Sequence, residues 1–552
     1  MGEFKIEKGV LVKYTGIEGS VVVPDGVTTI GREAFSFHFL NAEIQFPDSV
    51  TELEECAFMN NNSLTGTVVI PKGVTVIREN TFYGCSKIKK IVLPHGLTTI
   101  ENNAFRKCYS LSEIAIPATV TDISPTAFAE SSDIKEFKVE ENNPVYKSVD
   151  GNLYTKDGKT LLNYAIGKNT EKFSIPEGVK ELGAYSFFQC YLTDVIIPEG
   201  VTKIGESAFR NCQYLSNVTL PKSLKIIDNN AFREAVVKDM DIPVGTERVG
   251  DMAFHKCRNI QRIVIPYTVN HLGTMAFPSC NTNTVLELSP ENPHFKMVDG
   301  ILYSADGTRL ITAVSAKALT ETVIPDGVRE IDGYAFASAN ELTQVVIPEG
   351  VMSIGEAAFC KCKKLPEIAL PSSLKMIAKN AFSTCHALTE AVIPEGVEYI
   401  GSNAFYDCES LRKAVIPDSI NQINGYIFVY CKLIKEIHIN LKKAYLLDRY
   451  GVNFHITAAV IRTALTRYFN NSLSDEEGVI MQKIISRKLT EATEHLYNYP
   501  PFMQFVTEKN IMNAELSEAL MKNDKLCTEC RALLINYLRS LSKDRDPNEY
   551  KL

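Results

Sequence analysis

A phrase of about 23 residues recurs along the chain and constrains its fold more than any other feature. It reads IPEGVTKIGESAFRNC at 197–212, PEGVMSIGEAAFCKC from Pro348 and PEGVEYIGSNAFYDC from Pro394. In all fifteen copies a phenylalanine follows the anchoring proline by eleven residues. A fixed period of this length predicts a solenoid, in which each copy is one coil stacked on the last. The anchors are Pro24, Pro47, Pro71, Pro94, Pro117, Pro176, Pro198, Pro221, Pro243, Pro266, Pro325, Pro348, Pro371, Pro394 and Pro417.

Each copy begins with a strand pattern. The residues one and three before the proline are nearly all apolar, as with Ile347 and Val345, and the residue four before is polar. This alternation predicts a short strand with one face turned inward. The proline ends the strand because it donates no ladder hydrogen bond. A Gly or Ser two residues later suits a tight turn, and a second apolar pair such as Val201 and Ile204 precedes the Ala-Phe anchor.

The repeat resembles a known family. The pattern LxxVxIPxGVTxIGxxAFxxC, present as Leu342 to Cys362, is similar to the BspA-like subclass of leucine-rich repeats of bacterial and protist proteins. The resemblance covers roughly residues 20–440 and implies a curved β solenoid with a parallel sheet. It also implies a binding or adhesion surface, not an enzyme, and many members are secreted or anchored to the cell surface.

The period is interrupted twice, by two steps of 59 residues. The extra segments match each other, and Asp157-Gly158 and Asp306-Gly307 predict two β-hairpin insertions near 137–172 and 287–321. They are either ribbons that protrude to touch a partner or braces for a change of curvature. The expected domains are therefore an N-terminal hairpin-like cap over 1–23 and a solenoid of fifteen repeats over 24–440.

Residues 441–552 change to helical periodicity and form the third expected domain, an α-helical C-terminal region. Ser474 and Glu477 predict a capping box before one helix, VIMQKIISRKLTEATEHL. Pro500-Pro501 is expected to separate the helices. A stripe of Leu526, Cys530, Leu534, Tyr537 and Leu541 marks the final helix. The region is either a cap for the solenoid or a second interaction module.

Cysteine is the most suggestive residue type for chemistry. Ten of the fourteen cysteines lie three residues after the anchor phenylalanine. We interpret this column as a packing slot, because unpaired cysteine is often buried and the same column accepts other residues. The cysteines are Cys85, Cys108, Cys190, Cys212, Cys257, Cys280, Cys362, Cys385, Cys408 and Cys431, and the other occupants are His38, Asn61, Ser131, Ala235 and Ala339.

No pattern in the chain indicates an active site. Cys527 and Cys530 form a CxxC pair, but a structural zinc site needs four ligands and no second pair lies nearby. Phosphate-binding loops, nucleophile elbows and HExxH motifs are missing from the sequence. His386 lies beside the cysteine column, and we attribute it to packing. We therefore expect neither catalysis nor a cofactor nor a metal ion.

The strand columns supply a candidate binding surface. Two residues before the proline, eleven of fifteen side chains are apolar, and they share the outward face with the polar column. A strip of β-branched residues edged by mixed charges suits a protein partner, although such residues also simply favour strands. The candidate partner-binding residues are Glu321, Gln344, Val346, Glu367, Glu390, Val392, Lys413 and Val415.

Net charge and hydropathy argue against two further classes of function, nucleic-acid binding and membrane insertion. A net charge of -8 argues against a nucleic-acid partner, and no window is apolar enough for membrane insertion. The N-terminus shows no signal peptide, so a cytoplasmic protein is expected as written, or a secreted or surface protein if the N-terminus was trimmed. The sequence thus favours a non-catalytic scaffold for another protein. The alternative is a cell-surface adhesin that binds a host protein or glycan.

Overall fold

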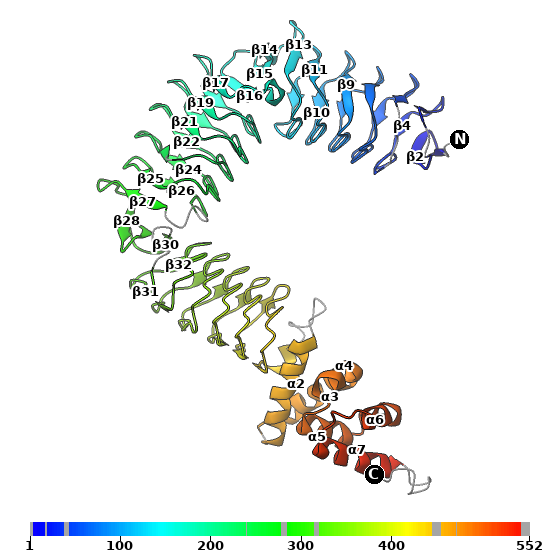
Figure 1. Cartoon of the computed structure of the whole chain (residues 1–552), viewed down its shortest axis with the longest axis vertical. Coiled ribbons are helices and arrows are strands. Elements are labelled where there is room, and N and C mark those ends of the chain that lie inside the picture. Colours follow the sequence, from blue (N-terminus) through cyan, green and yellow to red (C-terminus); the bar gives the residue numbers. More distant parts are fainter. Residues whose placement is uncertain are drawn as a thin grey trace. The chain divides into compact units, whose positions relative to one another are not determined.

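The computed structural model describes residues 4–16, 19–37, 43–238, 240–277, 284–313, 319–443, 454–470 and 472–541. The chain forms two compact units, Met1–Lys296 and Met297–Leu552, and each is described by itself (Figure 1). Both contain stacked coils whose strands pair in parallel from one coil to the next, which confirms the predicted solenoid. In the part of the chain described, no helix is long and apolar enough to cross a membrane.

Most coils carry a first strand, which ends one or two residues before the anchor proline where the coil has one, as predicted from the alternating pattern. In the first unit these strands are β3 (Val21–Val22), β5 (Ile44–Gln45), β7 (Gly66–Val69), β9 (Ile88–Val92), β11 (Glu113–Ile116), β13 (Glu136–Val139), β17 (Lys172–Ser174), β19 (Asp194–Ile196), β21 (Asn217–Thr219), β23 (Met240–Asp241), β25 (Arg262–Ile265) and β27 (Val285–Leu288). In the second they are β31 (Glu321–Val323), β33 (Gln344–Val346), β36 (Glu390–Val392), β38 (Lys413–Val415) and β40 (Glu436–His438).

A second strand of two residues follows the turn at each proline and ends on a buried or half-buried apolar residue. In the first unit these strands are β4 (Thr29–Ile30), β6 (Glu52–Leu53), β8 (Val76–Ile77), β10 (Thr99–Ile100), β12 (Asp122–Ile123), β18 (Glu181–Leu182), β20 (Lys203–Ile204), β22 (Ile226–Ile227), β24 (Arg248–Val249) and β26 (His271–Leu272). In the second they are β32 (Glu330–Ile331), β34 (Ser353–Ile354), β35 (Met376–Ile377), β37 (Tyr399–Ile400) and β39 (Gln422–Ile423). In the first unit, Figure 1 shows second strands such as β10 and β26 on the inner side of the curve and first strands such as β9 and β25 on the outer side.

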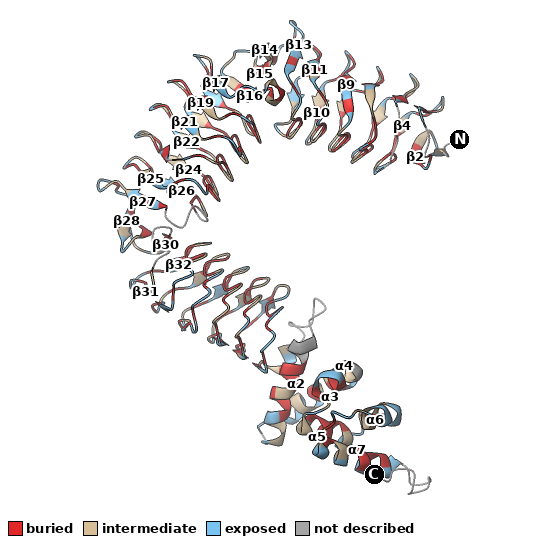
Figure 2. Cartoon of the chain, viewed as in Figure 1, coloured by how far each residue is buried: buried red, intermediate tan, exposed pale blue. Residues whose placement is uncertain are grey.

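The core is the inside of each coil, where the anchor phenylalanines stack on one another. Successive rings in the first unit, such as Phe58 and Phe82, lie 5.1 Å apart between centroids and are nearly parallel. Phe359 and Phe382 in the second unit repeat this arrangement at 5.4 Å. Figure 2 shows buried and exposed residues alternating around the coils, because inward and outward positions alternate along each strand. Each coil therefore completes its core only with its neighbours.

The two hairpin insertions are confirmed, and both are built into the stack. In the first unit β14 (Tyr146–Val149), β15 (Asn152–Thr155) and β16 (Thr160–Asn163) form an antiparallel meander, and β16 then pairs in parallel with β18. A 3-10 turn, η1 (Ile166–Lys168), follows. In the second insertion β28 (Phe295–Val298) precedes the hairpin of β29 (Ile301–Ser304) and β30 (Arg309–Thr312). Tyr154 and Tyr303 are both 2% exposed, which supports bracing and not protrusion.

The N-terminal end of the first unit carries a hairpin of its own. Strands β1 (Phe4–Glu7) and β2 (Val10–Tyr14) pair antiparallel, and β2 continues the second-strand sheet in parallel with β4. Leu11 and Tyr14 on β2 are buried against the first coil. This hairpin covers the apolar end of the stack, as a solenoid requires.

Helices follow the last coil of the second unit, as predicted. They are η3 (Leu441–Lys443), α2 (Phe454–Phe469), α3 (Asp475–Arg487), α4 (Leu489–Leu496), α5 (Pro500–Glu508), α6 (Ala514–Met521) and α7 (Thr528–Leu541). The predicted capping box of Ser474 and Glu477 is confirmed at the start of α3. Two details differ from the sequence analysis. The single helix expected after this box breaks at Lys488 into α3 and α4, and Leu541 is 47% exposed, because it lies in the last turn of α7.

Candidate protein-binding surface

The residues predicted for partner binding come together on the first-strand sheet of the second unit. Strand pairing sets Glu321 of β31 opposite Gln344 of β33. In the same way it sets Glu390 of β36 opposite Lys413 of β38 and Val392 opposite Val415. Because side chains two residues apart on a strand share a face, the polar and apolar columns form two adjacent rows on one surface.

The apolar row is exposed, although it consists of β-branched residues. Val323 is 70% exposed, Val346 43% and Val392 49%, and Val415 is half-buried. The residues between the two rows, such as Val345 and Ala391, are buried in the coil. Valine has a stiff side chain, so an ordered row of exposed valines loses little conformational freedom when it is covered.

The polar row beside the valines is mostly acidic. Glu321, Glu367 and Glu390 are exposed, and Lys413 is half-buried. Lys413 Nζ lies 3.8 Å from Glu390 Oε2, and this exposed ion pair contributes little to stability. The carboxylates of this row are therefore available to a cationic partner.

The first-strand sheet of the second unit is interrupted at one coil. Glu367 lies in a coil with no first strand, and only an isolated bridge joins Val346 to Ala369. Pro366 precedes Glu367 and has no N–H to donate, so the ladder cannot start where it does in other coils. The valine row is thus interrupted at Ala369, whose side chain is smaller than the valines on either side of it.

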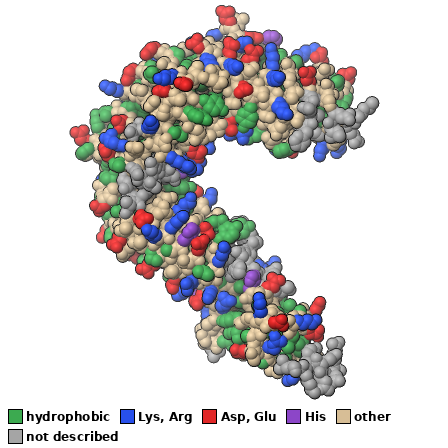
Figure 3. Space-filling view, in the orientation of Figure 1, with side chains coloured by type: hydrophobic (Ala, Val, Ile, Leu, Met, Phe, Trp, Pro, Cys, Tyr) green, Lys and Arg blue, Asp and Glu red, His purple; other side chains and the backbone are tan. Residues whose placement is uncertain are grey.

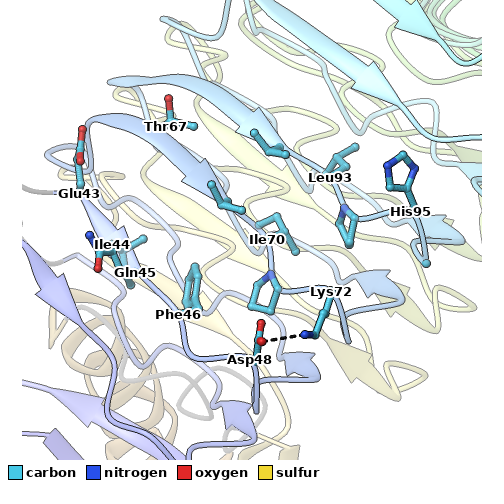
Figure 4. Close-up of a pocket in the computed structure, with 15 residues that line it drawn as sticks. Glu43, Ile44, Gln45, Phe46, Asp48, Thr67, Ile70, Lys72, Leu93 and His95 are labelled. Atoms are coloured by element: carbon cyan, nitrogen blue, oxygen red, sulfur yellow. Dashed lines mark hydrogen bonds and ion pairs between the residues drawn. The ribbon is translucent and has the colours of Figure 1, made fainter.

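The equivalent sheet of the first unit contains an open hollow of about 870 Å³. Strands β5, β7 and β9 contribute its lining, with Phe46, Ile70 and Leu93 among the apolar residues. Figure 4 shows Glu43 and Thr67 at one end of the hollow and the ion pair of Asp48 and Lys72 at the other; that pair measures 2.7 Å. Two exposed valines, Val69 and Val92, complete the lining. An apolar floor with a charged rim matches the anatomy of protein interfaces.

The sequence analysis did not single out this hollow, although it left two signals there. The step from Pro47 to Pro71 is 24 residues, one more than the usual 23, and the register shifts between Gly66 and Thr67. Phe46 also stands in a column that otherwise holds aliphatic residues, and its ring packs edge-on against Phe58. Irregular repeats were therefore the best guide to this part of the surface.

The cysteine column is buried where it is described, and its thiols have a role that the sequence did not reveal. The Cys385 thiol donates a hydrogen bond to the carbonyl of Phe359 in the preceding coil, at 3.2 Å. Two other occupants of the column do the same: Ser131 Oγ donates to Phe105 O at 2.6 Å and Asn61 Nδ2 to Phe35 O at 3.3 Å. The thiol bonds come from Cys85, Cys108, Cys212, Cys257, Cys362, Cys385, Cys408 and Cys431. Cys280 and His38 lie outside the described residues.

Burial also lowers the reactivity of this column. It raises the pKa of Cys385 to about 12, so the side chain stays a thiol at neutral pH. The CxxC pair is similar, because burial raises the pKa of Cys530 to about 12. Among the described residues no third or fourth metal ligand gathers with Cys527 and Cys530. The thiols of the cysteine column therefore contribute core packing and hydrogen bonds.

Charges on the described surface are mixed. Figure 3 shows acidic and basic side chains interspersed over the visible face of the first unit. Many of them pair between neighbouring coils, as Lys138 does with Glu113 at 2.6 Å and Arg262 with Glu287 at 2.8 Å. A surface of this kind lacks the continuous basic stripe with which proteins hold nucleic acid.

Comparison with known proteins identifies the repeat. The model of the BspA type leucine rich repeat region matches residues 10–144, 164–284 and 313–435, in six copies. No curated protein matches the chain.

Solved bacterial structures share the repeat architecture at low identity. A leucine rich cell surface protein from Faecalibacterium prausnitzii is 24% identical, over 81% of this chain and 95% of its own, with a TM-score of 0.40. A leucine-rich repeat protein from Bacteroides ovatus is 23% identical over 76% and 93%, with a TM-score of 0.31. The pneumococcal vaccine antigen PcpA is 19% identical over 79% and 85%, with a TM-score of 0.39.

Proposed function

Because the chain belongs to the BspA type leucine rich repeat family, we propose that it is a non-catalytic scaffold that binds another protein along its first-strand sheet. The observation that carries this proposal is the row of exposed valines bordered by carboxylates on strands β31, β33, β36 and β38. A partner that covers such an array of apolar side chains gains the free energy of their burial.

The apolar and acidic side chains of the row indicate which kind of partner surface would fit it. Val323, Val346 and Val392 suit a partner with an apolar ridge, and Glu321 and Glu390 suit lysines or arginines on either side of that ridge. Opposite charges at the rim of an interface steer the partner and fix its register, while the apolar centre supplies most of the affinity. We expect an extended or helical basic segment to fit best.

Substitution of exposed valines tests this proposal and leaves the buried core residues unchanged. Val346→Lys and Val392→Lys are combined in one variant, because both side chains are exposed and both replacements keep a long aliphatic stem. The matched control is Met376→Lys, which changes an exposed residue of the second-strand sheet in the same unit. A partner is first captured by the full chain from cytosolic and surface fractions, and its affinity for each variant is then measured by calorimetry.

We expect the double variant to lose at least about tenfold in affinity, which corresponds to roughly 1.4 kcal/mol, and the Met376 variant to match the wild type. Equal affinity of all three proteins would contradict the proposal and direct attention to another surface. Loss of binding in the control alone would assign the partner to the second-strand sheet.

A second candidate is an adhesin that binds a glycan, and two exposed tyrosines favour it. Tyr191 and Tyr214 are 46% and 57% exposed, and their ring centroids lie 5.8 Å apart. Aromatic faces held in this way can stack on the apolar face of a sugar ring. Glycan-array binding that disappears in Tyr191→Ala and Tyr214→Ala, but not in the valine variant, would favour the adhesin over the scaffold.

A further inference from the structure

Three side chains with metal-binding chemistry meet at one corner of the second unit. They are His386, which follows Cys385, and Asp407 and Glu409, which flank Cys408 in the next coil. The ligand atoms that they offer all lie within 4.8 Å of one another. Among the described residues, no other group of three or more His, Cys, Asp or Glu side chains has this arrangement.

Stacking of the coils holds this cluster in place. Ser410 N–H donates to His386 O at 3.1 Å, and Asp407 N–H donates to Val429 O at 2.8 Å in the following coil. Asp407 adopts a left-handed backbone conformation with φ +56°, which turns it out of the coil. The cluster therefore belongs to the rigid stack and requires no folding around an ion.

The distance between His386 and Asp407 fits a tetrahedral ion. His386 Nε2 lies 3.5 Å from Asp407 Oδ2. Zinc bonds to nitrogen and oxygen of about 2.0–2.2 Å place neighbouring tetrahedral ligand atoms roughly 3.3–3.6 Å apart. The observed separation is longer than an ordinary hydrogen bond and equals one edge of such a tetrahedron.

His386 Nε2 also has no hydrogen-bond partner, although this atom is shielded from solvent. A shielded nitrogen without a partner costs free energy, and a bound cation would remove that cost by taking its lone pair. The adjacent thiols do not compete for the ion, because Cys385 and Cys408 point into the core and donate to Phe359 O and Phe382 O.

We propose that His386, Asp407 and Glu409 form a site for a divalent transition-metal ion, with Zn²⁺ as the best match. One imidazole and two carboxylates without a thiolate suit zinc among these ions. Glu409 is exposed, so an ion can enter from its side of the cluster and water can fill the fourth position. The ion joins two neighbouring coils, and the open position can accept a donor atom from a bound protein.

Zinc binding to the full chain tests this proposal. After treatment with a chelator, the protein is dialysed and titrated with Zn²⁺ by calorimetry, and Co²⁺ is used as a spectroscopic substitute. We expect one ion per chain and a cobalt spectrum with visible bands but no thiolate charge-transfer band. Thermal denaturation should show a higher Tm with zinc than without it.

Matched variants separate this site from other zinc ligands. His386→Ala removes one ligand, and Asp407→Asn replaces a charged ligand by a weaker neutral one while asparagine tolerates the left-handed backbone at 407. His95→Ala is the control for a histidine beside a single carboxylate, since His95 Nδ1 lies 3.3 Å from Glu140 Oε1. Cys527→Ser is the control for the CxxC pair.

Loss of a residue that only supports a metal ligand costs roughly 10–100-fold in metal affinity. We expect the two ligand variants to lose more zinc affinity than this, and zinc should no longer raise their Tm. The two controls should bind zinc as the wild type does. The proposal is overturned if the wild type binds no zinc at micromolar concentrations. It is also overturned if Cys527→Ser abolishes binding while His386→Ala retains it.

Discussion

At the scale of single residues, inward side chains of the repeat pack in the core. Some of them also donate hydrogen bonds to backbone carbonyls of the preceding coil. The cysteine column is the clearest case, because the Cys385 thiol donates a hydrogen bond to the carbonyl of Phe359. Ser131 replaces cysteine in this column and keeps the same hydrogen bond, to Phe105 O. Most occupants of the column are therefore small residues with a donor, and alanine fills the same slot by size alone at Ala235 and Ala339.

Replacing Cys385 tests the role of this hydrogen bond. Cys385→Ala removes one of two hydrogen bonds to Phe359 O, which keeps the one from Cys362 N–H, so we expect a loss of about 0.5–1.5 kcal/mol in the free energy of unfolding. Cys385→Ser keeps the donor and should cost less than the alanine variant. Chemical denaturation followed by circular dichroism measures both, and equal losses would show that the thiol only fills space.

The same residue predicts a dependence on pH. The folded pKa of Cys385, about 12, lies above the unfolded value of about 8.5, so the protonated thiol stabilises the folded state fully below the unfolded pKa. This contribution is lost as the pH rises toward the folded value. The stability of the wild type should therefore fall above about pH 8.5 more steeply than that of Cys385→Ser.

At the scale of elements, one asparagine joins each hairpin insertion to the coil before it. Asn143 is fully buried; its Nδ2 donates to Pro117 O and Val120 O, both at 2.9 Å. Its Oδ1 accepts from the N–H groups of Val145 and Tyr146. Asn292 makes the same contacts before the second insertion, starting with Pro266 O at 2.9 Å. The side-chain amide therefore supplies hydrogen bonds to backbone groups that another coil would otherwise pair with.

Removing this amide should loosen the insertion. Asn143→Ala removes four hydrogen bonds, of whose partners Pro117 O keeps another bond from Val120 N–H, and we expect a loss of about 3 kcal/mol or more. Asn142→Ala is the control, because Asn142 is the exposed neighbour. Hydrogen exchange of residues 146–163 should accelerate only in the Asn143 variant. Unchanged protection would contradict this role of the asparagine.

At the scale of the whole chain, the ends of the stack need cover, and the helices supply it for the second unit. Helix α2 packs on the last strand, β40. The N–H of Ile437 on this edge strand donates to Thr463 Oγ1 of α2 at 3.0 Å. The hydroxyl thus takes the place of the next coil's carbonyl, and the first helix acts as a cap.

A chain that ends at Asn440 should consequently be less stable than one that ends at Leu541. Removing α2 exposes the edge of β40, and each isoleucine that becomes exposed costs about 1.5–3 kcal/mol. We expect a lower Tm and aggregation, measured by calorimetry and light scattering. Equal stability of the two truncated chains would show that the solenoid closes its end by itself.

Thr463→Val tests the same cap without truncation. It should cost about 1–3 kcal/mol in the free energy of unfolding because Ile437 N–H loses its partner, whereas Thr463→Ser should retain the bond. Chemical denaturation of the full chain measures both variants. A valine variant as stable as the serine variant would contradict the role of this hydroxyl.

The candidate surface could be predicted only in part. The valines and carboxylates on β31 to β38 follow from strand alternation, so the sequence pattern alone predicts their common face. The hollow at Phe46 was not predictable, because its lining comes from three coils and a pattern within one repeat does not show how they meet. The zinc cluster was not predictable either, because His386 and Asp407 become neighbours only through the stacking of two coils.

The sequence by itself determined the coil, because period, proline, phenylalanine and alternating apolar residues act within one repeat or between consecutive ones. It also determined the two insertions and the change to helices after the last coil. Only the tertiary structure decided how the insertions pack and which hydrogen bonds the cysteine column makes. It also decided that Thr463 closes the last strand. These features depend on distances between residues that are about one coil or more apart, and a pattern of residue types does not contain such distances.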